Sequence, residues 1–233
     1  MKYCVLIPAR AGSKGVKNKN KRICAGKPLI NYTIEAAQAS FKSNDIFIST
    51  NDHDIVDICK NLNINTSYKR PDSLAQSDSK MIDVVKDFAS WLNANNQDYD
   101  NIILLQVTSP LRTSTHINEA VSLFDKKRND HINLLVSVVE VPHNFICDSQ
   151  YQETYGDTIC GSNERISTRQ NKTKYIARNG PAILIMNRNF ILNTESFYSN
   201  DFIIYRMDRL SSIDIDDEND FITAEYLLNI FRK

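Results

Sequence analysis

The sequence predicts an α/β protein in which helices cover both faces of a mostly parallel sheet. Two observations support this prediction. Short apolar runs typical of buried strands recur along the chain, and they alternate with segments whose apolar residues follow helical spacing. We expect one catalytic unit over residues 1–233, because 42% hydrophobic residues are enough for a substantial core.

The predicted elements follow one another in a regular order. Apolar runs predict strands at residues 3–7, 45–50, 64–68, 102–105, 134–139, 182–186 and 201–207. Helical spacing predicts helices through residues 29–37, 55–59, 82–92, 117–124 and 218–231. Polar residues that can cap these helices precede several of them, namely Asn51 with Asp52, Ser114 or Thr115, and Asp216 or Asp217.

A basic loop with two glycines follows the first predicted strand. Gly12 and Gly15 let backbone N–H groups come close to a ligand, and five cations can follow the charge of a polyphosphate: Arg10, Lys14, Lys17, Lys19 and Lys21. A solvated basic loop has the same composition. The position after a strand favours a ligand site, because ligands of open α/β sheets bind at the carboxyl ends of strands. The chain contains neither the P-loop motif nor the dinucleotide-binding glycine motif.

A pair of acidic residues near the C-terminus is the second candidate site. Asp214 and Asp216 alternate with isoleucines, so an extended strand at residues 212–216 would place both carboxylates on one face, where they can hold a divalent cation. The alternative is that Asp216 or Asp217 only caps the helix that follows. Polyphosphate chemistry usually needs Mg²⁺ held by one or two carboxylates, so the basic loop favours the metal site.

Three further segments have two possible interpretations. Residues 106–112 form either a ligand loop or a turn before a helix, and residues 76–79 suit either an N-cap or a ligand loop. Residues 141–178 lose the strand–helix alternation and predict an excursion from the main domain, which would act as a lid or as a subunit contact.

Composition argues against several classes of protein. Lys and Arg together number 28, as do Asp and Glu, so the basic loop is a local feature and nucleic acid is not the expected partner. Five scattered cysteines without a C-x-x-C pair indicate reduced thiols. No signal-peptide core and no apolar run of about 20 residues is present, so we expect a cytoplasmic protein with no membrane partner.

Several motifs together resemble the CMP-sialic acid synthetase family, also called acylneuraminate cytidylyltransferases. They are IPARAGSKG at residues 7–15 with NKN at 18–20, LQVTSPLR at 105–112, RQ at 169–170 with NG at 179–180, and SIDID at 212–216. The motifs appear in the order of the family and span nearly the whole chain. CMP-Kdo synthetases are less similar, because the SKG and NKN elements belong to the nonulosonate side of the superfamily.

The resemblance implies a Rossmann-like, three-layer nucleotidyltransferase fold with a small dimerisation excursion, matched here by residues 141–178. It implies a homodimer in which this excursion reaches over the partner's active site. The implied reaction joins CTP to a nine-carbon 2-keto acid sugar and releases pyrophosphate, with Mg²⁺ required and Mn²⁺ able to substitute. The sugar is sialic acid or a relative, and residues 141–145 look more like the legionaminic acid branch.

The resemblance also implies roles for single residues. Arg10, Lys14 and Lys19 would hold the triphosphate with help from Ser13, while Asp214 and Asp216 would bind the metal, Asp216 as the stronger ligand. Asp214 would in addition help to deprotonate the attacking hydroxyl, directly or through bound water. The remaining implied contacts are Asn20, Arg70 and the backbone near Ser79 for cytidine, and Gln106, Arg169 and Asn179 for the acid sugar.

The chain departs from the family pattern at four positions. Met81 replaces a serine near the cytosine, Val107 stands where proline is common, Pro181 follows the Asn-Gly pair, and Leu184 replaces a tyrosine of the sugar pocket. The alternatives are a CMP-Kdo-type or other nucleotidyltransferase and a non-catalytic nucleotide-binding protein. A simple binder would have little reason to keep two aspartates on one strand face.

Overall fold

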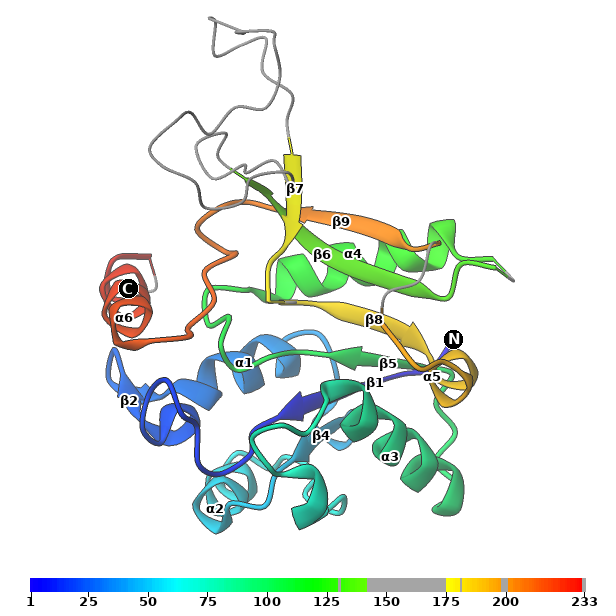
Figure 1. Cartoon of the computed structure of the whole chain (residues 1–233), viewed down its shortest axis with the longest axis horizontal. Helices are drawn as coiled ribbons and strands as arrows, with labels where there is room; N and C mark the ends of the chain where they lie inside the picture. The colour runs from blue at the N-terminus through cyan, green and yellow to red at the C-terminus, as the bar shows by residue number, and fades with distance from the viewer. Residues whose placement is uncertain (130, 142–174, 181, 198–200, 232–233) are drawn as a thin grey trace, which may run out of the picture.

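The computed structural model describes residues 1–129, 131–141, 175–180, 182–197 and 201–231. Its strands are β1 (Tyr3–Pro8), β2 (Ile23–Cys24), β3 (Lys27–Pro28), β4 (Ile46–Ser49), β5 (Asn101–Leu104), β6 (Leu134–Val141), β7 (Tyr175–Arg178), β8 (Leu184–Asn187) and β9 (Ile203–Met207). Its α-helices are α1 (Leu29–Gln38), α2 (His53–Asn61), α3 (Met81–Ala94), α4 (Ser114–Lys127), α5 (Arg188–Asn193) and α6 (Glu218–Phe231). Figure 1 shows their arrangement.

The central sheet has seven strands in the order β4-β1-β5-β8-β6-β7, with β9 also paired to β6. Strands β4, β1, β5, β6 and β9 point one way, whereas β8 and β7 are antiparallel to their neighbours. The chain leaves β1 to form β4 on one side and later returns to form β5 on the other side. The carboxyl end of β1 is therefore a topological switch point, the usual ligand position in such sheets.

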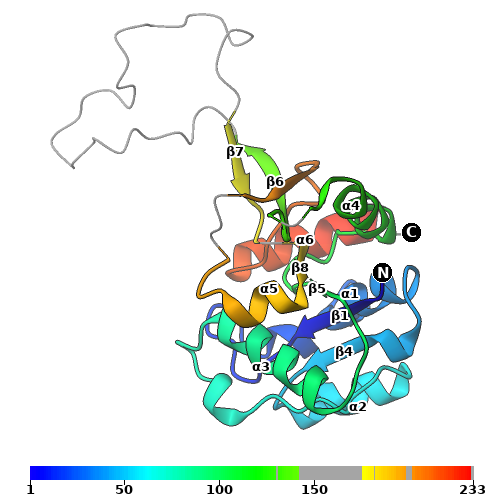
Figure 2. The same cartoon turned by 90° about the vertical axis from the view of Figure 1, so that its right-hand side faces the viewer.

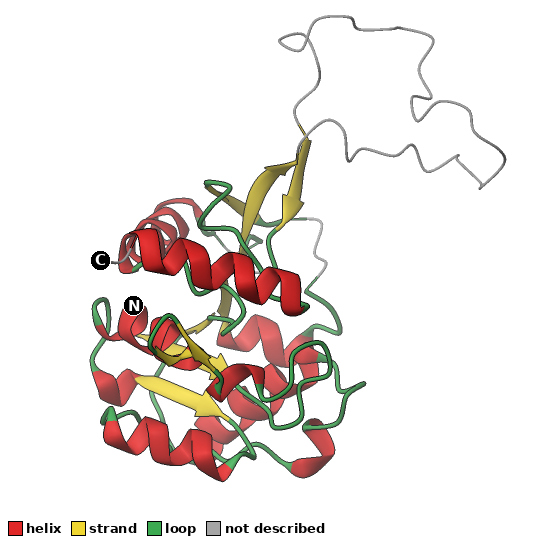
Figure 3. Ribbon diagram, turned by 90° about the vertical axis from the view of Figure 1, so that its left-hand side faces the viewer, coloured by secondary structure: helices red, strands yellow, loops and turns green. Residues whose placement is uncertain are grey.

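The sheet is the middle of three layers. Alternate residues of β1 face opposite sides, with Val5 and Ile7 in one apolar cluster and Cys4 and Leu6 in the other. The first cluster also contains residues of α1, α2, α4 and α6, and the second contains residues of α3 and α5. Helices thus cover both faces of the sheet, as the sequence predicts (Figures 2 and 3).

Two predicted strands do not form in the described part of the chain. At residues 64–68 only Asn65 makes an isolated bridge, to Phe47. Residues 212–216 are not part of a strand. They contact the loop after β5, where Ile215 N–H donates to the Thr108 carbonyl at 2.9 Å. Both predictions of a strand were wrong, because alternation in the sequence does not supply a neighbouring strand along which the whole segment can pair.

The cap of α4 also differs from the prediction. Thr113, rather than Ser114 or Thr115, is the N-cap, and it forms a capping box with His116. Asp52 caps α2 as predicted, since its side chain accepts from Asp54 N–H. Asp217 is the acidic residue that caps α6, because its Oδ1 accepts from the N–H groups of Asn219 and Asp220 at 2.8 and 3.0 Å.

Strands β6 and β7 extend away from the rest of the sheet as an antiparallel pair (Figure 2). The pair flanks residues 142–174, so most of the predicted excursion at residues 141–178 lies outside the described residues. Among the described helices, none has the length and apolar character needed to span a bilayer.

Candidate active site

The loop after β1 is folded by its own polar side chains. Ser13 donates its hydroxyl proton to the Val16 carbonyl at 2.6 Å and accepts from Lys19 N–H at 2.9 Å. Asn20 donates to the Arg10 carbonyl at 3.1 Å, and Asn51 accepts from the backbone N–H of residue 11 at 3.0 Å. The side chains of Ser13 and Asn20, predicted to contact substrate, therefore hold the shape of this loop.

The five cations of the loop differ in what they contact. Lys21 forms ion pairs with Asp52 at 2.9 Å and with Asp54 at 2.7 Å, so its charge is balanced by the start of α2. Arg10 donates to carbonyl groups of its own loop at 3.0 and 3.1 Å. Lys14 has no hydrogen-bond or ion-pair partner within the part of the chain that the structure describes, and it is exposed.

The basic loop and the acidic segment touch each other directly. A Cβ atom on Gly15 would lie 1.9 Å from the backbone oxygen of Asp216, so the contact exists only because residue 15 has no side chain. Lys19 adds a second link, since its ammonium group donates to the Ile215 carbonyl. Burial lowers the pKa of Lys19, while Asp216 and Asp214 act in the opposite direction. Residues separated by about two hundred positions thus form one site.

Helix α6 fixes this contact from the C-terminal side. Arg22 forms an ion pair with Glu218 at 2.7 Å, and its guanidinium lies 4.1 Å from the centre of the Phe221 ring. Glu225 accepts from the backbone N–H of Ala25 at 2.9 Å. The loop after β1 and helix α6 accordingly lie on the same side of the molecule (Figure 1).

Asp214 lies in an environment suited to a cation. Its Oδ1 is buried and has no hydrogen-bond partner among the described residues. Burial raises the pKa of this carboxyl, and the neighbouring Asp216 and Asp220 charges add to the effect, whereas Thr108 and Lys19 oppose it. A buried carboxylate oxygen without a donor is costly to leave unpaired, which favours a bound cation there.

Asp216 is exposed, and the backbone around it is held by Asp220. The Asp220 carboxylate accepts from the N–H groups of Asp216 and Asp217 at 3.0 and 3.1 Å. Together with the Asp217 cap, these bonds fix the turn between the acidic segment and α6. Of the two residues that the sequence offers as the cap of α6, Asp217 is the cap. The Asp216 side chain does not cap the helix.

The sugar side of the predicted site includes Gln106, Gly180 and Asn179. Gln106 donates from Nε2 to the Gly180 carbonyl at 3.1 Å. Gly180 has a φ of +107°, and a Cβ atom there would lie 2.8 Å from Asp214 Oδ2. Gln106 is therefore close to the acidic segment. Asn179 is buried, and its amide donates to Ser212 Oγ at 2.9 Å and accepts from Ser137 Oγ at 2.6 Å, so it joins β6 to the acidic segment rather than facing solvent.

The predicted cytidine contacts lie near the carboxyl end of β4. Arg70 is buried, its backbone N–H donates to the Thr50 carbonyl at 3.3 Å, and its Nε donates to the Leu74 carbonyl at 2.9 Å. Burial lowers the pKa of Arg70, and the Arg10 cation acts in the same direction. Ser79 is only partly exposed and donates to the Ser73 carbonyl at 3.3 Å. Arg169, the third predicted sugar contact, lies outside the described residues.

The four departures from the family pattern fall in different environments. Leu184 is fully buried in β8, where it pairs with Leu104 and Val136, so this residue belongs to the core and not to a pocket wall. Val107 is also buried, and Met81 is the first residue of α3. Pro181 lies outside the described residues.

Two residues of the site were missed in the sequence. Thr108 contacts both Gln106 and the acidic segment, and Asp220 holds the Asp216 backbone. The signal for Asp220 is present in the sequence, because an acidic residue three positions after a capping aspartate can accept from the cap's own N–H. No pattern in the sequence predicts the contact of Thr108 with residues more than one hundred positions away.

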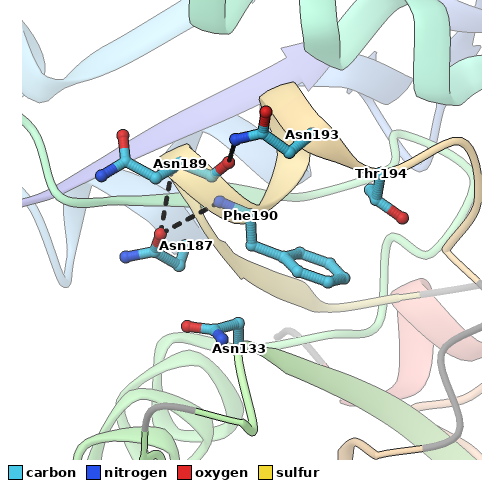
Figure 4. A pocket seen from close by; sticks show the side chains of 6 residues that line it. All are labelled: Asn133, Asn187, Asn189, Phe190, Asn193 and Thr194. Atoms are coloured by element: carbon cyan, nitrogen blue, oxygen red, sulfur yellow. Dashed lines mark hydrogen bonds between the residues drawn. The ribbon is translucent and has the colours of Figure 1, made fainter.

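A surface cavity of about 460 Å³ lies elsewhere on the molecule, beside α5 (Figure 4). Its lining includes Asn133, Asn187 and Phe190, and Asn187 pairs with Asn101 at the start of β5. The cavity is therefore at the amino end of the parallel strands, opposite the loop after β1. Asn187 serves as the cap of α5, accepting from the N–H groups of Asn189 and Phe190.

Comparison with known proteins identifies the family. A family model described as cytidylyltransferase matches residues 4–231. The chain belongs to the cytidylyltransferase family. The match includes both the loop after β1 and the acidic segment, so the two halves of the site lie within the region that the family model matches.

Two curated relatives are similar over almost the whole chain. The N-acylneuraminate cytidylyltransferase of Streptococcus agalactiae serotype V is 35% identical over 224 residues, which cover 95% of this chain and 52% of the relative. The CMP-N,N'-diacetyllegionaminic acid synthase of Legionella pneumophila is 31% identical over 237 residues, covering 99% and 97%. The chain thus spans about half the length of the first relative and nearly all of the second.

A solved structure supports the fold. A CMP-2-keto-3-deoxy-manno-octonic acid synthetase in complex with CTP superposes with a TM-score of 0.68 at 14% identity and covers 98% of both chains. This similarity confirms the predicted nucleotidyltransferase-like α/β architecture.

Proposed function

We propose that this cytidylyltransferase activates a nine-carbon 2-keto acid sugar with CTP and releases pyrophosphate. The observation that carries the proposal is the contact of Gly15 with the Asp216 backbone, which joins a polyphosphate-type loop to a carboxylate pair. The names of the relatives from Streptococcus agalactiae and Legionella pneumophila support a sugar of the sialic or legionaminic acid class.

Mg²⁺ is the proposed cofactor, with Mn²⁺ able to replace it. The donor set fits a hard cation, because the partnerless Asp214 Oδ1 and the exposed Asp216 carboxylate both supply oxygen. When bound, the ion would neutralise charge on the phosphates of CTP. Asp214 and Asp216 are the residues that would hold it.

The residues of the chain support an in-line displacement at the α-phosphorus. Lys14, Lys19 and Arg10 would bind the triphosphate and stabilise the pyrophosphate as it leaves. Gln106 would orient the acid sugar so that its anomeric hydroxyl faces the phosphorus. The Asp214 side of the metal site would help to take up the proton of that hydroxyl, directly or through bound water.

A pyrophosphate-release assay tests the proposal. CTP, ATP, GTP and UTP are each combined with sialic, legionaminic and pseudaminic acids and with Kdo. We expect release with CTP and a nonulosonic acid. Release with Kdo alone would favour a CMP-Kdo-type enzyme, and CTP binding without release in any combination would favour a non-catalytic nucleotide-binding protein.

Removal of divalent metal is expected to stop the reaction. Treatment with EDTA should abolish pyrophosphate release with CTP and the active sugar, and added Mg²⁺ or Mn²⁺ should restore it, because the carboxylates and the triphosphate are all negative and need a divalent cation between them. Protein carried through the same treatment in buffer without EDTA serves as the control. Full activity after dialysis against EDTA would contradict the metal proposal.

The acid side of the pH profile should depend on metal concentration. Burial raises the pKa of Asp214, so this group takes up a proton at a higher pH than an ordinary aspartate does. Only the ionised form binds a cation, so activity at limiting Mg²⁺ should fall as the pH drops through the raised pKa. The acid limb of kcat/KM should move to lower pH as Mg²⁺ is increased. An acid limb independent of Mg²⁺ would argue against Asp214 as a ligand.

A homodimer and a reducing, cytoplasmic location complete the proposal. Residues 141–178 would form the dimer contact, and light scattering of the purified protein tests this. The described cysteines Cys4, Cys24 and Cys59 are free and buried, which suits a reducing compartment.

A further inference from the structure

Thr108 lies in the loop after β5, between the two sides of the proposed site. Its backbone carbonyl accepts from Ile215 N–H at 2.9 Å, and Ile215 stands between Asp214 and Asp216. This bond is therefore placed to hold the backbone of the acidic segment against the end of β5.

The Thr108 side chain makes contacts of its own. Its hydroxyl donates to Gln106 Oε1 at 3.2 Å. Burial raises the pKa of the Asp214 carboxyl, and the Thr108 hydroxyl acts against this increase. The hydroxyl has one proton and gives it to Gln106, while the Thr108 backbone carbonyl holds Ile215, so Thr108 links the Gln106 amide to the segment that carries Asp214.

A second connection runs between the same two residues. Gln106 Nε2 donates to the Gly180 carbonyl at 3.1 Å, and Gly180 lies against Asp214 Oδ2. With Thr108 on one side and Gly180 on the other, both ends of the Gln106 amide are bound. Neither connection requires a residue outside the described part of the chain.

We propose that Thr108 is a positioning residue that fixes the Asp214 carboxylate relative to the Gln106 amide. Its hydroxyl keeps the metal side and the sugar side of the site in one register, in the way that partners behind metal ligands orient the ligands themselves. This inference rests on the proposed function, because it assigns Asp214 and Gln106 the roles given above.

Three variants test the hydroxyl. Thr108→Val removes it at nearly constant volume, and Thr108→Ser keeps it. Thr33→Val is the matched control, because Thr33 is buried and its hydroxyl donates to the Gln106 backbone carbonyl at 3.4 Å. This control removes a hydroxyl that contacts the same loop but makes no contact with Asp214. If Thr108→Val does not fold, as judged by thermal unfolding, Thr108→Ala takes its place.

The first readout is binding of Mn²⁺ in the presence of CTP. The electron paramagnetic resonance signal of free Mn²⁺ measures this binding. We expect Thr108→Val to weaken binding about tenfold, the lower end of the effect of removing a partner of a metal ligand. Thr108→Ser and Thr33→Val should bind like the wild type. Wild-type affinity in Thr108→Val, or an equal loss in Thr33→Val, would overturn the proposal.

The second readout separates binding from turnover. Thr108→Val should lower kcat and raise the KM for the acid sugar while the KM for CTP stays constant, and Thr108→Ser should restore both values. If wild-type protein releases no pyrophosphate but Thr108→Val still loses Mn²⁺ affinity, the proposed function fails and the role of Thr108 stands. If wild-type protein binds no Mn²⁺, the role of Thr108 fails with the metal site.

Discussion

Replacement of Gly15 by alanine should reduce pyrophosphate release at least about 100-fold, because a displacement of about 1 Å in a site of this kind costs that much. The new Cβ would lie 1.9 Å from the Asp216 carbonyl oxygen, a distance that real Cβ atoms do not show. The basic loop and the acidic segment must then move apart, which separates the cations from the carboxylates. Steady-state release with CTP and the active sugar measures the loss.

The control for this variant is Gly26→Ala. Gly26 lies in the turn between β2 and β3 with a φ of +90°, and a Cβ there meets nothing within 4 Å. Alanine at a positive φ costs roughly 1 kcal/mol of stability, so this variant should melt earlier and keep its turnover. Wild-type activity in a folded Gly15→Ala protein would show that the contact with Asp216 is not needed for the reaction.

Asp214→Asn should also lower turnover at least about 100-fold, the loss typical for removal of one charge-stabilising group in an active site. Asparagine matches aspartate in shape, so the close packing against Gly180 is kept while the negative charge is lost. The variant would lack both a metal ligand and a proton acceptor. The rate is measured at saturating Mg²⁺, so that weaker metal binding alone does not explain the loss.

The matched control is Asp217→Asn in the same segment. Asp217 accepts from two N–H groups at the start of α6, and asparagine caps helices about as well as aspartate. This variant should keep its stability and activity, which separates a general effect of charge from the role of Asp214. Full turnover of Asp214→Asn at saturating Mg²⁺ would remove Asp214 from the proton-transfer step.

Several residues that a family motif links to substrate use their side chains within the protein. Ser13 and Asn20 close the loop after β1, Arg70 binds the Leu74 carbonyl, and Asn179 joins Ser137 to Ser212. A motif of this kind therefore combines residues that meet the ligand with residues that hold the loop. The two groups have the same sequence signal, and only their contacts distinguish them.

The sequence by itself determined the local features of this protein. The apolar runs located six strands of the central sheet, namely β1, β4, β5, β6, β8 and β9, but not β7. The helix predicted at residues 218–231 has the bounds of α6, and the charges marked the loop after β1 and the segment around Asp214. These features depend on neighbouring residues, and composition and periodicity report them directly. The strand predicted at residues 64–68 was wrong, because only Asn65 of this segment pairs with β4, through a bridge to Phe47.

Tertiary structure alone decided how the distant segments meet. Gly15 is a flexible loop residue in the sequence, and in the fold it lies directly against the backbone of Asp216. Lys21 and Lys19 look alike in the sequence, yet one pairs with Asp52 and the other with the Ile215 carbonyl. Contacts across about two hundred residues depend on the packing of β1, β5 and α6, and a local pattern carries no information on that packing.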